Sequence, residues 1–170
     1  MKSDFKKISI IGLGLIGTSI LHAINTKQKE RVTTFAYDVN SEHREIVSEM
    51  KIATLVCDEI NDAVKDADLV ILAVPVGSMK SVAKSITSSL KEGAIVTDTG
   101  STKNSVINDV NPYIPTRVNF IPSHPLAGTE YSGPQAALPD LFFNKFQIIC
   151  ETQKTRPDFL EWAQDWCKKI

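Results

Sequence analysis

A histidine stands alone in a stretch of turn residues late in the chain. The segment SHPLAGTEYSGP, residues 123–134, carries two glycines and two prolines and lacks the apolar period of a helix or a strand. We therefore expect a loop. Its histidine, His124, is a candidate general base, because imidazole has the side-chain pKa nearest neutrality. Oxidation of an alcohol carbon needs a base for the hydroxyl proton, and a positioned base typically contributes about 10²–10⁴ in rate.

A glycine pattern near the amino terminus is typical of dinucleotide binding. GLGLIG directly follows the strand-like run Lys7–Ile11 and opens a helical pattern. Such glycines allow a tight turn, a close approach of the backbone to a pyrophosphate and close helix–strand packing. The free N–H groups and the positive end of the helix dipole would bind the pyrophosphate. The predicted cofactor-binding residues of this turn are Gly12, Leu13, Gly14, Leu15, Ile16 and Gly17.

An aspartate stands where such a site needs a carboxylate. Asp38 ends the second strand-like run, 21 residues after Gly17, where it would accept hydrogen bonds from the ribose hydroxyls. Its neighbours are Val39 and Asn40, and Arg44 lies a helical turn further on, so no arginine stands beside it to receive a 2′-phosphate. Because the carboxylate would also repel that phosphate, we predict NAD as the cofactor and NADP as less favoured.

The elements that must position these residues alternate between strand and helix patterns. We expect helices over Leu15–Asn25, from Asn40 or Ser41 onward with Glu42 in the first turn, and over Ser78–Leu90. This order predicts an α/β fold, a doubly wound, mostly parallel sheet with helices on both faces. The expected strands are Lys7–Ile11, Thr33–Tyr37, Thr54–Val56, Asp68–Val74, Ala94–Asp98 and a sixth ending in Asn119–Ile121.

Ligands in such sheets bind at the carboxyl ends of the strands, which adds candidates from two further loops. Val74 and Pro75 follow the fourth strand and are expected beside the cofactor. Ser101, in TDTGSTK after the fifth strand, allows two interpretations. It is either the N-cap of a helix from Thr102 onward or a hydrogen-bonding group of the site.

Composition excludes several other classes of function. The chain has 170 residues, a net charge of −1 and 42% hydrophobic residues, without a basic block, so we expect no nucleic-acid partner. No apolar run approaches the roughly 20 residues of a membrane span. Three distant cysteines, Cys57, Cys150 and Cys167, fit neither a disulfide framework nor a metal site and favour a reducing cytoplasm. His22 and His43, on expected helices, are assigned no role in the site.

The last residues predict a separate helix. Thr155 and Asp158 form a plausible capping pair, and Pro157 suits a first helical turn. We expect a dinucleotide-binding domain over residues 1–152, followed by the start of a C-terminal helix over 153–170. That helix either closes over the sheet or leads into a further domain.

Taken in order, these motifs resemble one family. GLGLIGTS, Asp38, AVPV, DTGSTK and above all HPLAGTEYSGP are similar to the prephenate and arogenate dehydrogenases of tyrosine biosynthesis, from about Lys7 to Cys150. The resemblance implies a Rossmann-like domain and NAD-dependent oxidative decarboxylation of prephenate to 4-hydroxyphenylpyruvate, with His124 as base. It also implies that Ser101 binds the substrate hydroxyl and helps to orient the histidine. Thr129 and Glu130 would lie beside the substrate.

The resemblance leaves several alternatives open. Family members continue into a helical C-terminal domain that supplies dimer contacts and cations for the substrate carboxylates, and this domain is expected to be largely absent here. A homodimer is expected if that domain is present. Arg117 and Arg156 are candidates for the cations by charge alone and are expected to be solvated. The substrate is prephenate or arogenate. The alternatives are an NAD-binding module without turnover, or another oxidoreductase of the hydroxyacid or imine reductase type.

Overall fold

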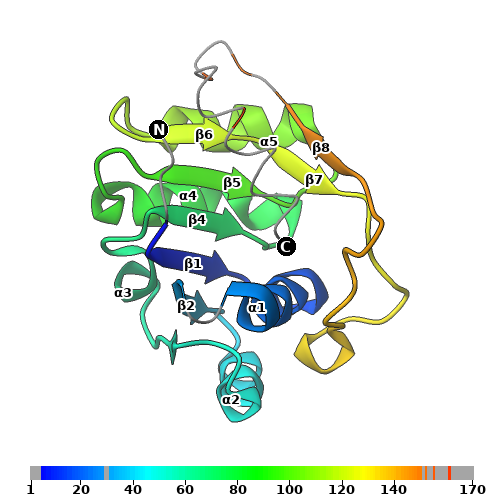
Figure 1. Cartoon of the computed structure of the whole chain (residues 1–170). Coiled ribbons are helices and arrows are strands. Elements are labelled where there is room, and N and C mark those ends of the chain that lie inside the picture. Colours follow the sequence, from blue (N-terminus) through cyan, green and yellow to red (C-terminus); the bar gives the residue numbers. More distant parts are fainter. Residues whose placement is uncertain (1–4, 29–30, 151, 153–154, 156–160, 162–170) are drawn as a thin grey trace.

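A six-stranded parallel sheet forms the centre of the protein. The computed structural model describes residues 5–28, 31–150, 152, 155 and 161 (Figure 1). The sheet has the order β3-β2-β1-β4-β5-β6, so the chain starts in the middle and winds outward in both directions. The predicted doubly wound fold is confirmed. The strands are β1 Lys7–Ile11, β2 Thr33–Tyr37, β3 Leu55–Val56, β4 Leu69–Leu72, β5 Ile95–Asp98 and β6 Asn119–Ile121.

Helices cover both faces of the sheet, and alternate residues of each strand point to opposite sides. On one face Val70, Leu72 and Val96 pack with apolar residues of α3, α4 and α5. On the other face Ile10 and Ile71 pack against α1 and α2. Strands buried on both faces need apolar side chains throughout, which explains the unbroken run in β4. The helices are α1 Leu15–Gln28, α2 Ser41–Met50, α3 Ile60–Val64, α4 Met79–Ile86 and α5 Lys103–Val110.

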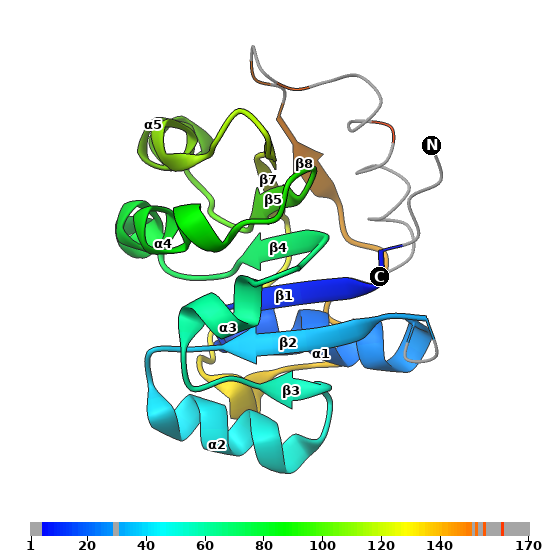
Figure 2. The same cartoon turned by 90° about the vertical axis from the view of Figure 1, so that its left-hand side faces the viewer.

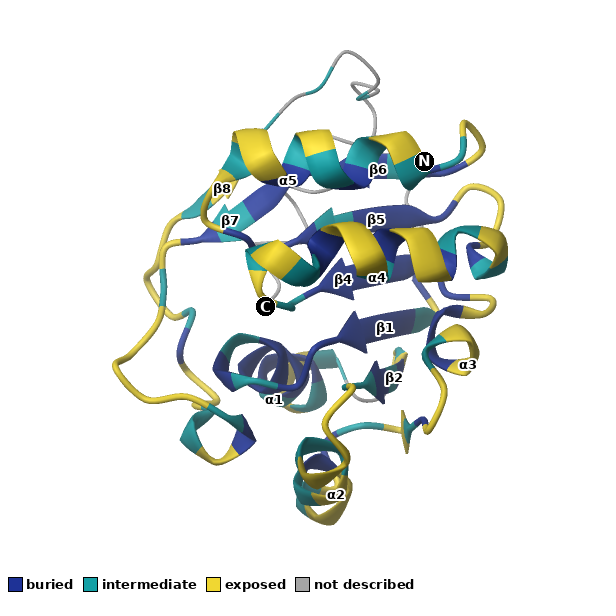
Figure 3. Cartoon of the chain, turned by 180° about the vertical axis from the view of Figure 1, so that it is seen from behind, coloured by how far each residue is buried: buried dark blue, intermediate teal, exposed yellow. Residues whose placement is uncertain are grey.

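The pictures show this layering directly. Figure 2 shows α4 and α5 together on one side of the sheet. In Figure 3 the strands β1, β4 and β5 are buried along most of their length, whereas the outer faces of α4 and α5 are exposed. Both helices are therefore amphipathic, as the sequence pattern predicts for α4.

Local signals set several element boundaries. Asn40 caps α2, and its side chain accepts a hydrogen bond from the Glu42 backbone N–H at 2.9 Å, so Asn40 rather than Ser41 is the cap. The helix expected over Ser78–Leu90 is shorter, because α4 ends at Ile86 and a 3₁₀ turn, Thr87–Ser89, follows. The five-residue helix α3 was not predicted, since so short a segment gives no helical period.

The segment expected to be a loop contains a strand. Ser123–Pro125 forms β7, which pairs antiparallel with β8, Gln147–Ile149, with His124 opposite Ile148. The prediction of a loop around His124 is therefore wrong. Pro122 separates β7 from β6, and its ring has no N–H with which to continue the parallel ladder. Figure 1 shows the pair of β7 and β8 beyond the carboxyl ends of β5 and β6.

The predicted C-terminal helix lies almost entirely outside the described residues. Pro157 and Asp158, which were expected in its first turn, lie outside the described residues, and so does Arg156. Thr155 is described, and its hydroxyl accepts a hydrogen bond from the Thr152 N–H at 2.8 Å. The proposed division into residues 1–152 and 153–170 therefore stays a prediction. None of the helices in the described part of the chain is both long enough and apolar enough to cross a membrane.

Candidate active site

A cavity of about 760 Å³ opens at the carboxyl edge of the sheet. It lies where β1 and β4 are neighbours but their connections leave in opposite directions, the position at which doubly wound folds bind ligands. Segments far apart in the sequence line it: the glycine turn, the end of β2, α2, the loop after β4 and residues 131–135. Among its lining residues are Gly12, Gly14, Leu15, Ile16, Asp38, His43, Val74, Pro75, Thr99, Tyr131 and Gln135.

The glycine turn leaves room for a ligand on one side only. Gly12 has a φ of +101°, and a Cβ there would lie 2.5 Å from the Ala73 carbonyl oxygen. A Cβ on Gly17 would lie 1.9 Å from the Gly12 oxygen, so helix and turn are in direct contact. Around Gly14, by contrast, no atom of the described residues other than its chain neighbours lies within 4 Å of such a Cβ. The first turn of α1 carries no acidic residue, so its N–H groups and dipole are available to an anion.

Asp38 is already oriented by the backbone around it. Its Oδ2 accepts a hydrogen bond from the Leu13 N–H at 2.6 Å, and its Oδ1 accepts one from the Asn40 N–H at 2.8 Å. The buried Leu13 therefore binds Asp38, and neither Leu13 nor Gly17 lines the cavity. The Asp38 side chain is 14% exposed and faces the cavity. A carboxylate has about four acceptor positions, so some stay available for hydroxyl groups.

Two basic side chains of α2 lie beside Asp38. His43 lines the cavity with Nδ1 3.5 Å from Asp38 Oδ2, a contact that the sequence interpretation did not expect. Arg44 donates from Nη1 to the Asp38 carbonyl oxygen at 2.8 Å and lies 5.8 Å from the centre of the Tyr37 ring. The guanidinium of Arg44 therefore supports the backbone outside the cavity.

The far wall of the cavity comes from the segment after His124. Tyr131, Ser132, Gly133 and Gln135 line it, and the 3₁₀ turn Pro134–Ala136 lies against α1 and α2. The Leu138 N–H donates to Ser19 Oγ of α1 at 3.0 Å, and this hydrogen bond holds the segment against α1. The sequence gives no signal for Tyr131, Ser132 and Gln135, whereas Gly133 and Pro134 mark a turn.

Thr129 and Glu130 do not reach this cavity. The Thr129 hydroxyl accepts a hydrogen bond from the Tyr131 N–H at 3.2 Å, and both residues are exposed. Their proposed place beside the substrate stays a prediction.

His124 is held by a backbone carbonyl. Its Nδ1 lies 2.8 Å from the oxygen of Thr99, a residue that lines the cavity. A carbonyl oxygen can only accept, so Nδ1 carries the proton, and Nε2 of the neutral ring is left as an acceptor. Nε2 has no hydrogen-bond partner among the described residues. The half-buried ring therefore has the tautomer that a general base needs.

Ser101 does not cap the helix that follows it. The N-cap of α5 is Thr102, which makes no side-chain capping bond, so the capping interpretation of Ser101 is wrong. Ser101 is exposed, and no hydrogen bond joins it to His124 in the described part of the chain. The carbonyl of Thr99 takes the orienting place that the resemblance assigns to Ser101.

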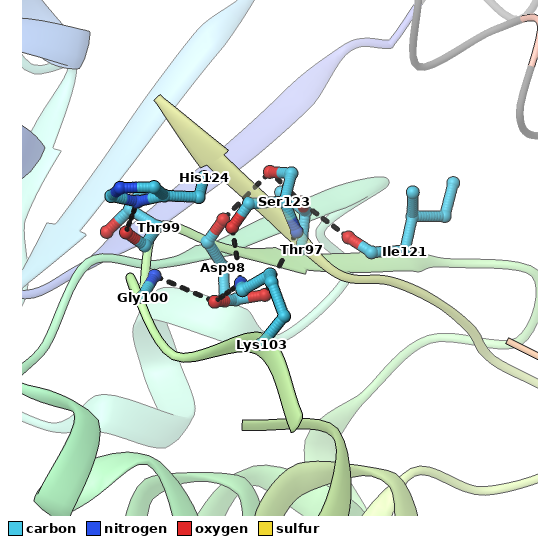
Figure 4. A network of polar contacts seen from close by, with 8 residues as sticks. All are labelled: Thr97, Asp98, Thr99, Gly100, Lys103, Ile121, Ser123 and His124. Atoms are coloured by element: carbon cyan, nitrogen blue, oxygen red, sulfur yellow. Dashed lines mark hydrogen bonds and ion pairs between the residues drawn. The ribbon is translucent and has the colours of Figure 1, made fainter. Parts of the chain in front are cut away.

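A buried ion pair lies beneath the histidine (Figure 4). Asp98, which is fully buried, pairs with Lys103 Nζ. Its Oδ2 also accepts from the Gly100 N–H at 2.8 Å, and its Oδ1 from the Ser123 N–H at 3.1 Å. Burial raises the pKa of the Asp98 carboxyl in spite of the lysine. Burial likewise lowers the pKa of Lys103, against the hydrogen bond to Asp98.

Hydroxyl groups extend this network to the neighbouring strands. Ser123 Oγ donates to the Asp98 carbonyl oxygen at 2.8 Å and lies 3.0 Å from Thr97 Oγ1. Thr97 Oγ1 in turn donates to the Ile121 carbonyl at 2.7 Å. Asp98, Lys103 and Ser123 were not predicted from the sequence as residues of the site. One signal for Asp98 was available in the sequence, since it is a charged residue at the end of an apolar strand. A charged residue that is buried there needs a partner of opposite charge.

Other candidates lie apart from this edge. Arg117 precedes β6, at the amino end of the sheet, and donates to the Leu90 carbonyl at 3.2 Å. It therefore cannot reach a substrate at the carboxyl edge. No group of three potential metal ligands occurs among the residues that the structure describes.

Comparison with known proteins identifies relatives along nearly the whole chain. Residues 22–170 match the family described as prephenate dehydrogenase, nucleotide-binding domain. A cyclohexadienyl dehydrogenase of Zymomonas mobilis is 39% identical over 166 residues, which cover 98% of this chain and 56% of that protein. A prephenate dehydrogenase of Lactococcus lactis is 36% identical over 161 residues, which cover 92% of this chain and 44% of that protein. The chain spans about half the length of these curated relatives.

A solved structure shows the same architecture. The crystal structure of prephenate dehydrogenase from A. aeolicus, in complex with hydroxyphenyl propionate and NAD⁺, superposes with a TM-score of 0.88 at 27% identity. The match covers 99% of this chain and 58% of that chain.

Proposed function

Because the chain belongs to the prephenate dehydrogenase family and matches its nucleotide-binding domain, we propose that it binds NAD and supplies a histidine base for the oxidative decarboxylation of prephenate to 4-hydroxyphenylpyruvate. One observation carries this proposal beyond cofactor binding. The hydrogen bond from His124 Nδ1 to the Thr99 carbonyl leaves Nε2 unprotonated in the neutral ring, next to a residue that lines the cofactor cavity.

The residues of the cavity fit a dinucleotide. The open space at Gly14 and the uncharged first turn of α1 suit a pyrophosphate, which the N–H groups of Leu15 and Ile16 would bind. The free acceptor positions of Asp38 suit the ribose hydroxyls. Bound NAD would supply the two-electron acceptor for the alcohol carbon of the substrate.

The same residues favour NAD over NADP. A 2′-phosphate would lie beside the Asp38 carboxylate, and like charges repel. Arg44 is occupied by the Asp38 carbonyl, by the Tyr37 ring and by Asp58, which lies 3.7 Å from its Nε. Titration calorimetry with both cofactors tests this, and equal affinity for NADP would contradict it.

His124 would handle the proton of the reaction. The hydroxyl proton of the substrate would pass to Nε2 while the alcohol carbon loses a hydride, which NAD would take up, and the C–O bond becomes a carbonyl. The Thr99 carbonyl keeps accepting from Nδ1–H, so the ring stays oriented when it becomes positively charged. The bond to the ring carboxylate then breaks, carbon dioxide leaves, and the electron pair of that bond restores the aromatic ring. The former carbonyl oxygen takes up a proton and becomes the phenol hydroxyl.

The test is NADH formation from prephenate and NAD, combined with calorimetry of NAD binding. We expect His124→Asn to lower turnover by about 10²–10⁴ and to leave the Kd for NAD almost unchanged. His22→Asn, on α1 and outside the cavity, is the matched control and should keep full turnover. Unchanged turnover in His124→Asn would exclude His124 as the base.

A second candidate is a nucleotide-binding module without turnover of its own. The observation that favours it is that Ser101, Thr129 and Glu130, which are proposed beside the substrate, do not line the cavity. NAD binding without NADH formation from prephenate or arogenate would support this candidate. Failure to bind NAD would contradict both.

A further inference from the structure

The residue before His124 is held at all three of its polar groups. The Ser123 N–H donates to Asp98 Oδ1 at 3.1 Å, and its carbonyl oxygen accepts from Lys103 Nζ at 2.5 Å. Its hydroxyl donates to the Asp98 carbonyl oxygen at 2.8 Å. All of these partners belong to the buried pair of Asp98 and Lys103. The pair therefore fixes the position of Ser123 relative to the end of β5.

Fixing Ser123 also fixes the backbone of His124. The peptide bond between the two residues is planar, so the lysine that holds the Ser123 carbonyl also orients the His124 nitrogen. On the other side Pro125 restricts His124 to extended conformations. Pairing of His124 with Ile148 of β8 adds to this restraint. Little freedom remains except rotation of the imidazole side chain.

The same carboxylate also places the acceptor of that imidazole. Asp98 Oδ2 accepts from the Gly100 N–H at 2.8 Å, which curls the chain directly after β5. The Thr99 carbonyl lies inside this curl and binds His124 Nδ1. Figure 4 shows Asp98 between the loop after β5 and strand β7, with Gly100 and Ser123 both bonded to it. One buried carboxylate thus fixes both partners of the bond that sets the tautomer.

Net stability is a weak explanation for this ion pair. A buried pair often contributes little stability, because removing both charges from water offsets their attraction. Burial shifts the pKa of Asp98 upward and that of Lys103 downward, both toward the neutral forms. Positioning is the role that the geometry supports.

We propose that Asp98 and Lys103 are positioning residues that hold the His124 imidazole in its Nδ1–H tautomer, with Nε2 available as the base. This rests on the proposed function only for the role of the histidine. The tautomer itself can be measured without turnover.

The experiment is nuclear magnetic resonance of the chain labelled with ¹⁵N-histidine, in the presence and absence of NAD. The chain has three histidines, and His124→Asn assigns the signal of interest, while His22 and His43 serve as internal references. We expect His124 of the unchanged chain to show the Nδ1–H tautomer. In Lys103→Met, which frees the Ser123 carbonyl, we expect this preference to be lost.

A matched control exists at the opposite edge of the sheet. Lys91→Met removes the lysine that bonds Asp68 at 2.5 Å, in an ion pair remote from His124. It should leave the His124 signals unchanged. If Lys103→Met does not fold, Asp98→Asn combined with Lys103→Met removes both charges and with them the unpaired buried carboxylate. That double variant should also lose the tautomer preference.

The outcomes separate the two proposals. A folded Lys103→Met or double variant with the wild-type His124 tautomer would overturn the positioning role, whatever its turnover. Loss of the tautomer in a chain that turns over no substrate would support positioning and count against the proposed function. Where there is turnover, Lys103→Met should lower kcat by roughly 10-fold to 100-fold and leave the Kd for NAD unchanged.

Discussion

Asp38 and Asp98 occupy equivalent places in the fold and have different surroundings. Each stands at the carboxyl end of a parallel strand, and each accepts one N–H from two residues ahead, Asn40 or Gly100. Each also accepts one N–H from a distant segment, Leu13 or Ser123. Only Asp98 has a lysine. Asp98 is fully buried, whereas the Asp38 side chain is 14% exposed in the cavity wall.

The lysine accounts for the difference in role. Lys103 occupies acceptor capacity that Asp98 would otherwise offer, and its charge balances that of the fully buried carboxylate. Asp38 has His43 at 3.5 Å but no bonded cation, so its remaining lone pairs face the cavity. A carboxylate at the end of a strand is therefore open to a ligand at Asp38 and is a structural anchor at Asp98.

Replacing each aspartate by alanine tests this comparison with the largest expected effect. Asp98→Ala leaves the Lys103 ammonium buried without its partner, and the Gly100 and Ser123 N–H groups lose their acceptor. We expect the free energy of unfolding to fall by about 3–5 kcal/mol. Asp38→Ala should lower it by about 1 kcal/mol. Urea denaturation measures both, with Asp58→Ala as control, since that side chain is 96% exposed. Similar losses at the two sites would break the comparison.

For the affinity for NAD, we expect the larger effect from Asp38→Ala and the smaller effect from Asp98→Ala. Under the proposed function, Asp38→Ala removes an acceptor for the ribose hydroxyls, and it also releases the Leu13 N–H of the glycine turn. Hydrogen bonds to a charged group contribute about 1.5–3 kcal/mol, so the Kd for NAD should rise roughly 10-fold to 100-fold. Calorimetry measures the change. Asp58→Ala should bind NAD like the unchanged chain, and an unaltered Kd in Asp38→Ala would remove Asp38 from the cofactor site.

The sequence predicts Asp38 and misses Asp98 for a physical reason. Asp38 follows from its spacing after the glycine turn, a spacing that is typical of dinucleotide sites. Asp98 binds the protein itself, and its partner Ser123 is distant in sequence, across a crossover that no local pattern encodes. The strand β7 was missed likewise, since three residues beside a proline give no period and β8 lies beyond a long connection. The alternation of longer strands and helices was enough for the fold.

A third aspartate gives the smallest and most specific prediction. Asp68, before β4 at the amino edge, bonds Lys91 and the backbone N–H groups of Lys6 and Lys7. Burial alone would raise the pKa of Asp68, but these hydrogen bonds outweigh it and lower the pKa. A lowered pKa in the folded state means that Asp68 contributes stability above the pKa of an unfolded aspartate. That contribution is lost as the pH falls through the folded pKa.

Asp68→Asn should therefore lower the free energy of unfolding at neutral pH by about 0.2–1 kcal/mol, because the pair is partly solvated. The difference from the unchanged chain should vanish in acid, below the usual range of an aspartate. The pH dependence of stability has the opposite sign at Asp98. Because its pKa is raised, the folded state takes up a proton at a higher pH than the unfolded state, and this proton uptake favours folding as the pH falls. Urea denaturation across the acid range measures the difference between Asp68→Asn and the unchanged chain. If the difference in the free energy of unfolding persisted or grew in acid, Lys91 would not stabilise the ionised carboxylate of Asp68. The pair of Asp68 and Lys91 would then resemble the buried pair of Asp98 and Lys103.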